Sequence, residues 1–132
     1  MRGNLPSAAA AAAAASSNGA ALPLSFSHTK QLHARLILAS PASFPADLRL
    51  LLLRSYAARG DLASARHLLD EAPRPASPLL YNALIRAHAR RLDLPAALAL
   101  FARMRRSATP PDARTFACVL RACADCSRPG AL

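Results

Sequence analysis

The sequence predicts an all-α protein, an α-solenoid of stacked antiparallel helical hairpins. Three observations predict this fold class. Apolar residues recur at helical spacing along most of the chain, and short segments containing Pro or Gly separate the apolar stretches. The pattern of one predicted hairpin also returns further along the chain. Repetition at a period of about 20–50 residues is typical of solenoids, because each unit buries its apolar face only against its neighbours.

The internal repeat is visible when the sequence is compared with itself. A shift of 32 residues aligns segment 55–69 with segment 87–101, including an Asp-Leu pair in each. A second shift, of 35 residues, aligns Tyr81 with Phe116. Matches between Ala or Leu positions are expected by chance in a chain so rich in both. The Asp-Leu pair and the aromatic pair argue against coincidence.

Local signals divide the repeats into short helices. Asp93 precedes a helix as its N-cap, and Pro95 lies in the first turn, where a missing N–H costs nothing. The prolines of segment 109–112 end that helix. In the preceding hairpin, Gly60-Asp61 forms the turn between the two helices, and segment 73–75, with two prolines, ends the second helix. The resulting predicted helices span residues 28–39, 47–58, 62–72, 79–91, 94–106 and 113–125.

The first 27 residues differ in composition from the rest. They contain one charged residue, Arg2, several serines and the alanine run Ala8–Ala15, and no acidic residue precedes Asp47. A Ser-rich segment without acids is typical of an organellar transit peptide. We therefore predict a disordered Ala/Ser-rich presequence at 1–27 directing the protein to a mitochondrion or chloroplast, with the mitochondrion favoured. The alternative is a tail without a targeting role.

The 132-residue chain has a formal net charge of +10, and Lys30 is its only lysine among 17 basic residues. A hydrophobic content of 53% excludes a wholly disordered chain. The richest apolar run, 48–56, is interrupted by Arg49 and Arg54, so it is too short to span a membrane. The arginine excess suits binding to nucleic-acid phosphates, and a GC-rich coding sequence would produce the same excess.

Three segments carry a family resemblance. Residues 79–85 (LLYNALI), 96–104 (AALALFARM) and Pro111-Asp112 resemble the pentatricopeptide repeat signature. They fall within one unit of 35 residues, from Pro78 to Asp112. The competing tetratricopeptide repeat calls for a Trp in its first helix, and this chain has none.

Other segments resemble variants of the same repeat. Segments 55–66 and 70–73 together resemble its short variant. Segments 30–35 and 115–124 resemble parts of its long variant. The order long, short, regular, long is typical of the plant subclass involved in organellar RNA processing and editing. The resemblance implies an N-terminal fragment of a longer array. The expected divisions are a presequence (1–27), a partial repeat (28–45), a short-type repeat (46–77), a complete repeat (78–112) and a truncated long-type repeat (113–132).

The resemblance also implies a function: repeats of this kind read single-stranded RNA at about one base per repeat. In the complete repeat the reading residues fall on Asn82 and Asp112, with Leu79 packing on the base, and this combination implies a preference for uridine. A purely local role is the alternative, in which Asn82 only caps or bonds nearby groups and Asp112 only caps the next helix. The capping role of Asp112 is expected in either case and does not exclude contact with a base. The corresponding positions of the neighbouring units hold Leu50 and Ala117, to which we assign no base.

Several arginines could contact RNA phosphates, or could form an ordinary solvated helix face. They are Arg86, Arg90, Arg91, Arg103, Arg105 and Arg106.

The sequence offers little for catalysis or metal binding. Cys118, Cys123 and Cys126 fall short of the four ligands of a structural zinc site, so we expect core packing for the first two. The histidines within predicted helices, His33, His67 and His88, are expected to be partly buried.

We therefore predict a non-enzymatic adaptor with no catalytic residue, cofactor or metal. Its expected partners are organellar single-stranded RNA and other RNA-processing proteins, with no membrane and no small-molecule substrate. The alternative function is a tetratricopeptide-like protein-interaction scaffold, or a remnant without function.

Overall fold

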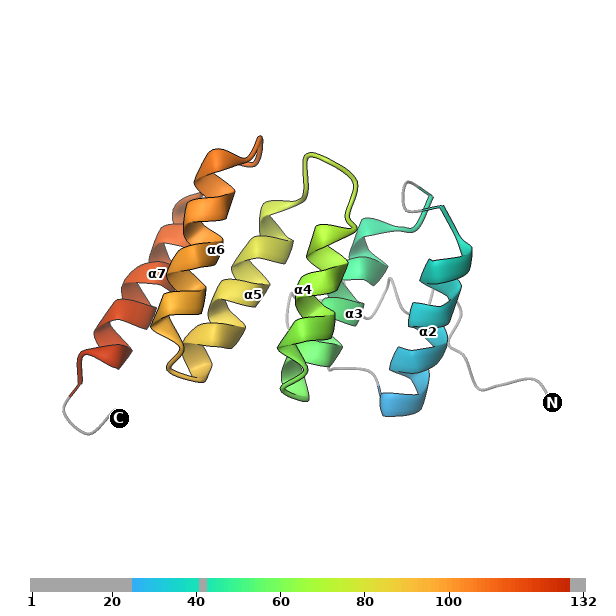
Figure 1. Cartoon of the computed structure of the whole chain (residues 1–132), viewed down its shortest axis with the longest axis horizontal. Helices are drawn as coiled ribbons and strands as arrows, with labels where there is room; N and C mark the ends of the chain where they lie inside the picture. Colours follow the sequence, from blue (N-terminus) through green and yellow to red (C-terminus); the bar gives the residue numbers. More distant parts are fainter. Residues whose placement is uncertain (1–24, 41–42, 129–132) are drawn as a thin grey trace. The chain divides into compact units, whose positions relative to one another are not determined.

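The computed structural model describes residues 25–40 and 43–128, and this part of the chain is all-α (Figure 1). Each helix begins and ends within two residues of the predicted bounds, and the packing of helices in hairpins confirms the predicted fold class. The helices are α2 (Phe26–Leu38), α3 (Ala46–Ala58), α4 (Leu62–Asp70), α5 (Pro78–Arg90), α6 (Leu94–Arg106) and α7 (Ala113–Cys126). They form two units, α2–α4 and α5–α7, each described by itself.

Helix α2 begins earlier than predicted because a serine caps it. The Ser25 hydroxyl accepts a hydrogen bond from the backbone N–H of His28 at 3.2 Å, which starts the helix at Phe26, inside the predicted presequence. The remainder of that presequence, residues 1–24, lies outside the described residues.

In the first unit, α3 packs against both α2 and α4. Four leucines of α3 are almost wholly buried: Leu48, Leu51, Leu52 and Leu53. Leu68 and Leu69 of α4 complete this core. Arg49 is 2% exposed, and its guanidinium donates to the backbone carbonyl of Leu68 at 3.2 Å. This charged group therefore ties α3 to α4 across the core.

In the second unit, α5 packs against both α6 and α7, which also contact each other (Figure 1). Tyr81, Leu84 and Ile85 of α5 are fully buried. The residues that α6 buries are Ala97, Leu100 and Met104. On the same helix Leu98 is left 40% exposed.

The turns inside the two complete hairpins have the same geometry. After α3, the N–H of Asp61 donates to the carbonyl of Tyr56, and Gly60 has φ of 82°. After α5, the N–H of Asp93 donates to the carbonyl of His88 in the same way, and Leu92 takes φ of 57°. Both are Schellman turns, in which the residue with positive φ is usually glycine.

The loop between α6 and α7 is fastened to the start of α5. The buried hydroxyl of Thr109 donates to the backbone carbonyl of Ala76, 33 residues earlier in the chain. Asp112 then begins α7 as its N-cap, and its side chain accepts from the N–H of Thr115 at 3.0 Å. The predicted capping roles of Asp93 and Asp112 are confirmed, and the loop brings Asp112 close to α5.

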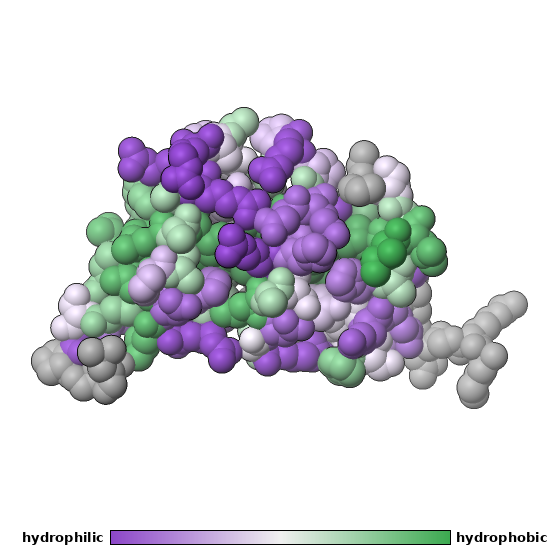
Figure 2. Space-filling model, viewed as in Figure 1, coloured by the Kyte–Doolittle hydropathy of each residue, from purple (hydrophilic) through white to green (hydrophobic). Residues whose placement is uncertain are grey.

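One flank of the second unit exposes large apolar side chains. Phe116 is 50% exposed and Leu120 is 69% exposed, although the repeat aligns them with the fully buried Tyr81 and Ile85. Figure 2 shows hydrophobic residues spread over the side where α6 and α7 lie, and hydrophilic residues gathered where α6 ends. Within the described ranges, every helix is too short or too polar to cross a membrane.

Candidate nucleic-acid interface

Three polar side chains meet where α5 faces the start of α7. Nδ2 of Asn82 donates to Oδ1 of Asp112 at 3.4 Å, and the hydroxyl of Thr115 lies 2.6 Å from Oδ1 of Asn82. The backbone N–H groups of Asp112 and Thr115 each bond the other's side chain, at 3.2 Å and 3.0 Å, which completes a capping box. The fold therefore joins two predicted reading residues that lie 30 positions apart.

The three predicted site residues differ in exposure. Asn82 is only 4% exposed, Asp112 is half-buried, and Leu79 is 37% exposed one helical turn before Asn82 on α5. The exposed apolar side chain and the half-buried carboxylate thus form the open part of the site. A ligand would approach Asn82 past these two residues.

The hydrogen bonds at the start of α7 hold Asp112 in its charged form. The N–H of Thr115 contributes most to lowering the pKa of Asp112, and the Asn82 amide lowers it further. Asp112 is therefore an ionised carboxylate at neutral pH, able to accept hydrogen bonds and unable to donate them.

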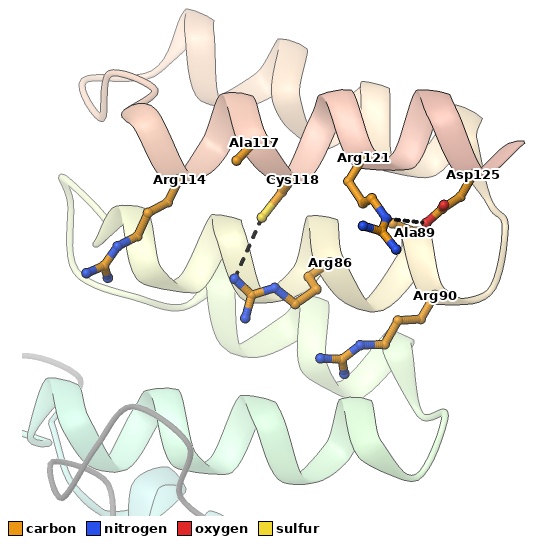
Figure 3. A pocket seen from close by; sticks show the side chains of 8 residues that line it. All are labelled: Arg86, Ala89, Arg90, Arg114, Ala117, Cys118, Arg121 and Asp125. Atoms are coloured by element: carbon orange, nitrogen blue, oxygen red, sulfur yellow. Dashed lines mark hydrogen bonds and ion pairs between the residues drawn. The ribbon is translucent and has the colours of Figure 1, made fainter. Parts of the chain in front are cut away.

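A groove of about 420 Å³ runs between α5 and α7 (Figure 3). Four arginines line it, and Figure 3 shows them on the sides of the two helices that border the groove. The lining residues are Arg86, Ala89, Arg90, Arg114, Ala117, Cys118, Arg121 and Asp125.

The groove is positively charged, because only Asp125 opposes its four arginines. Arg121 is paired with that carboxylate at 3.1 Å, and Arg86 donates to Sγ of Cys118 at 3.8 Å. Asn82 lies one helical turn before Arg86 on α5, so the polar cluster adjoins one end of the groove. A polyanion following the groove would therefore pass the cluster.

The six arginines that could contact phosphates or form a solvated helix face lie in three kinds of place. Arg86 and Arg90 line the groove, whereas Arg91, Arg105 and Arg106 are exposed outside it. Arg103 lies over the ring of Tyr81, with its guanidinium carbon 5.9 Å from the ring centre. Sequence reasoning missed the two arginines that α7 contributes, Arg114 and Arg121. Their spacing with Cys118 and Asp125 follows one helix face and could have identified them.

The expected core positions of the cysteines are wrong. Cys118 and Cys123 are both half-buried, and Cys118 borders the groove, because α7 buries Thr115, Val119 and Ala122 instead. The prediction that the helical histidines are partly buried holds for His33 and His88. It is wrong for His67, whose side chain is 64% exposed beside Glu71.

The positions to which no base was assigned keep their apolar character. Leu50 is 9% exposed in the core of the first unit, and Ala117 lines the groove between the arginines. Neither side chain offers a hydrogen bond. Among residues 25–40 and 43–128, no three His, Cys, Asp or Glu side chains cluster as metal ligands would.

The fold and site define a class: a helical-repeat protein with a polar pair at the junction of consecutive repeats, beside an arginine-lined groove. The PPR repeat family model matches residues 77–125, which span α5, α6 and most of α7. The chain belongs to the pentatricopeptide repeat family.

Two relatives from Arabidopsis thaliana illustrate the extent of the similarity. The chain is 34% identical to pentatricopeptide repeat-containing protein At3g12770 over 98 residues, which is 74% of this chain and 14% of that protein. It is 38% identical to pentatricopeptide repeat-containing protein At3g16610 over 74 residues, which is 55% of this chain and 11% of that protein. The chain thus spans a small part of the length of these relatives. No solved structure is significantly similar to it.

Proposed function

We propose that this chain binds single-stranded RNA in a plant organelle as a non-catalytic segment of a longer repeat array, serving RNA processing, editing or another modification. The observation that carries the proposal is the meeting of Asn82 with Asp112 across a repeat junction, at 3.4 Å. Family membership supports it, since pentatricopeptide repeats read single-stranded RNA at about one base per repeat.

The complete repeat contacts one base through three residues. Asn82 and Asp112 bond the edge of the base, and the exposed side chain of Leu79 packs against its face. An amide can both donate and accept, while the ionised carboxylate orients the amide or bridges to the base through water. The uridine preference that the family resemblance implies is proposed for this repeat.

The groove between α5 and α7 holds the sugar–phosphate backbone next to that base. Its four arginines come from α5 and α7, the two helices that also carry the polar cluster. Each phosphate contact on a single strand contributes about 0.7 to the slope of log affinity against log salt concentration. Arginine is suited to this role because its planar fork fits phosphate oxygens.

The base contact is tested by titrating the ¹⁵N-labelled full chain with a uridine octamer and an adenosine octamer, followed by NMR. We expect tighter binding of the uridine octamer. The Asn82→Ala, Asp112→Ala double variant should lose that preference. A double variant that stays folded and keeps the preference would contradict the base contact.

The backbone contact is tested by the salt dependence of the same binding. We expect the Arg90→Gln, Arg114→Gln double variant to lower the slope by about 1.4, since two phosphate contacts are removed. Arg106→Gln is the matched control, because it removes the same kind of charge from an exposed position outside the groove. Equal loss of slope per arginine in the control would show that the groove has no special role.

Targeting to an organelle rests on the composition of the first 27 residues and on family membership, with the mitochondrion favoured over the chloroplast. A reporter protein fused to residues 1–45 is expected to enter one of these organelles in plant cells. A reporter that stays in the cytosol would contradict this part of the proposal.

A protein-interaction scaffold is a second candidate, because Phe116 and Leu120 expose an apolar flank that suits a partner helix. Binding of a protein partner that is indifferent to the Asn82, Asp112 double variant, together with absent RNA binding, would favour this candidate.

A further inference from the structure

The two ends of the Asn82 amide have different neighbours. Oδ1 faces the hydroxyl of Thr115 at 2.6 Å, and Nδ2 faces Oδ1 of Asp112 at 3.4 Å. The reversed amide would set its oxygen against an ionised carboxylate, and both atoms are acceptors. The carboxylate and the hydroxyl therefore select the same orientation, with Oδ1 turned toward α7.

The single proton of the Thr115 hydroxyl is available to hold this orientation. The backbone N–H of Asp112 donates to Oγ1 of Thr115 at 3.2 Å, so the hydroxyl is already an acceptor there. Its proton can reach Oδ1 of Asn82 at 2.6 Å, Oδ1 of Asp112 at 3.0 Å, or Sδ of Met104 at 3.8 Å. The contact with Asn82 is the shortest of the three.

Burial protects this contact from water. Thr115 is fully buried and Asn82 is 4% exposed, so solvent cannot readily replace the hydroxyl as the partner of the amide oxygen. Loss of the hydroxyl would leave the buried amide oxygen without a donor while Asp112 still holds Nδ2, so Oδ1 would become available to accept from a ligand. Which end of the Asn82 amide is open to a ligand thus depends on a residue of the next repeat.

We propose that Thr115 is a positioning residue that determines base specificity in the complete repeat. By occupying Oδ1 of Asn82, it leaves an N–H of the amide as the group presented to the ligand. Uracil carries carbonyl acceptors at O2 and O4, whereas the Watson–Crick edge of adenine sets its one acceptor, N1, beside the N6 amino donor, which calls for an acceptor such as an unoccupied Oδ1. The inference rests on the proposed RNA binding, and it names the structural origin of discrimination between these two bases.

Two substitutions separate this role from a capping role. Thr115→Val keeps the shape of the side chain and removes the hydroxyl. The main cap, from the Thr115 N–H to the Asp112 carboxylate, does not need that hydroxyl. Thr115→Ser restores a hydroxyl at the same position. A residue that served only to start α7 would change stability and would leave the ratio of affinities for two bases unaltered.

The experiment measures the ratio of affinities for the uridine and adenosine octamers by NMR, with the full chain and both variants. The side-chain amide signals of Asn82, assigned by their loss in Asn82→Ala, are recorded before RNA is added. We expect Thr115→Val to shift these signals and to reduce the affinity ratio roughly threefold to tenfold, the loss of about one hydrogen bond. Thr115→Ser should retain both properties.

The outcomes separate the inference from the function on which it rests. A wild-type chain that does not distinguish the octamers would overturn the proposed uridine reading and, with it, this role of Thr115. A wild-type preference for uridine that Thr115→Val retains in full would overturn the inference alone. A shift of the Asn82 signals with an unchanged ratio would also overturn it, because the contact between the hydroxyl and Oδ1 would then not determine specificity.

Discussion

Equivalent aromatic residues of consecutive repeats should differ in their contribution to stability. Tyr81 and Phe116 are aligned by the 35-residue shift, yet Tyr81 is fully buried and Phe116 is 50% exposed. Tyr81 lies on α5, which packs against both α6 and α7, and Arg103 of α6 lies over its ring. Phe116 instead contacts Phe101 edge to face, with ring centres 5.9 Å apart. Replacement of Tyr81 and of Phe116 by alanine therefore compares the same repeat position in two tertiary environments.

The expected free-energy losses follow from this burial. Replacement of a buried aromatic by alanine costs about 3–5 kcal/mol, from lost transfer free energy and the cavity left behind. Burial of a whole Phe side chain contributes about 1.5–3 kcal/mol, so a half-buried ring contributes about 1 kcal/mol. The contact with Phe101 adds about 0.5–1.5 kcal/mol. We therefore expect about 3–5 kcal/mol for Tyr81→Ala and about 1.5–2.5 kcal/mol for Phe116→Ala.

Hydrogen exchange of the backbone amides in α5–α7, followed by NMR, is the suitable assay. It reports the unfolding free energy of the second unit separately from that of the first. Tyr81→Phe is the control, because the Tyr81 hydroxyl has no hydrogen-bond partner among the described residues. Its removal should cost less than about 1 kcal/mol or increase stability.

Equal losses for Tyr81→Ala and Phe116→Ala would refute the reasoning. Such a result would mean that the exposed flank of α7 is covered in solution, by another part of the chain or by a second molecule. A large loss for Tyr81→Phe would show that the hydroxyl has a partner.

Two further predictions concern turns and pH. Leu92 takes positive φ at the position where the preceding hairpin has Gly60, and this conformation costs free energy for a residue with a Cβ. Leu92→Gly should therefore stabilise the second unit by about 1 kcal/mol. Gly60→Ala should destabilise the first unit by about 1–2 kcal/mol. Thermal unfolding measures both, and loss of stability in Leu92→Gly would contradict the first. Burial lowers the pKa of His33 below 6.5, and the Tyr56 hydroxyl bonds its Nδ1 at 2.6 Å. The folded unit therefore binds this proton less readily than the unfolded chain, so stability should fall as pH drops below 6.5 toward the folded pKa. His33→Gln should reduce the pH dependence of the melting temperature between pH 7.5 and 5. If the pH dependence is unaltered in this variant, other titrating groups cause it and the prediction for His33 is wrong.

The helices could be predicted because their signals are local. Asp93 and Asp112 cap helices through N–H groups three residues further on, and the prolines before α5 and α7 end the preceding segments. These effects act within about one helical turn, so a single sequence contains them. The positive φ of Leu92 is an exception, since nothing local distinguishes this leucine from one within a helix.

The candidate site could be predicted only in part. The resemblance located Asn82, Asp112 and Leu79, and the structure joins the first two. It did not indicate that Thr115 bonds the Asn82 amide, although a threonine three residues after a capping aspartate is a local sign of the capping box. The resemblance did not indicate Arg114 and Arg121 of α7, because only the packing of α7 against α5 brings them into one groove with Arg86 and Arg90.

The sequence by itself determined the repeat and the helix bounds, because periodicity and capping depend on neighbours along the chain. It indicated Asn82 and Asp112 as candidate reading residues only through the family resemblance. Only the tertiary structure decided which flank of each helix is covered. Tyr81 and Phe116 occupy the same position of consecutive repeats. Helix α5 packs against both α6 and α7 and buries Tyr81, whereas one flank of α7 leaves Phe116 and Leu120 exposed. The same packing placed Cys118 beside the groove and Thr115 against Asn82. Contacts between residues about 33 positions apart depend on how helices meet, which local side-chain preferences do not specify.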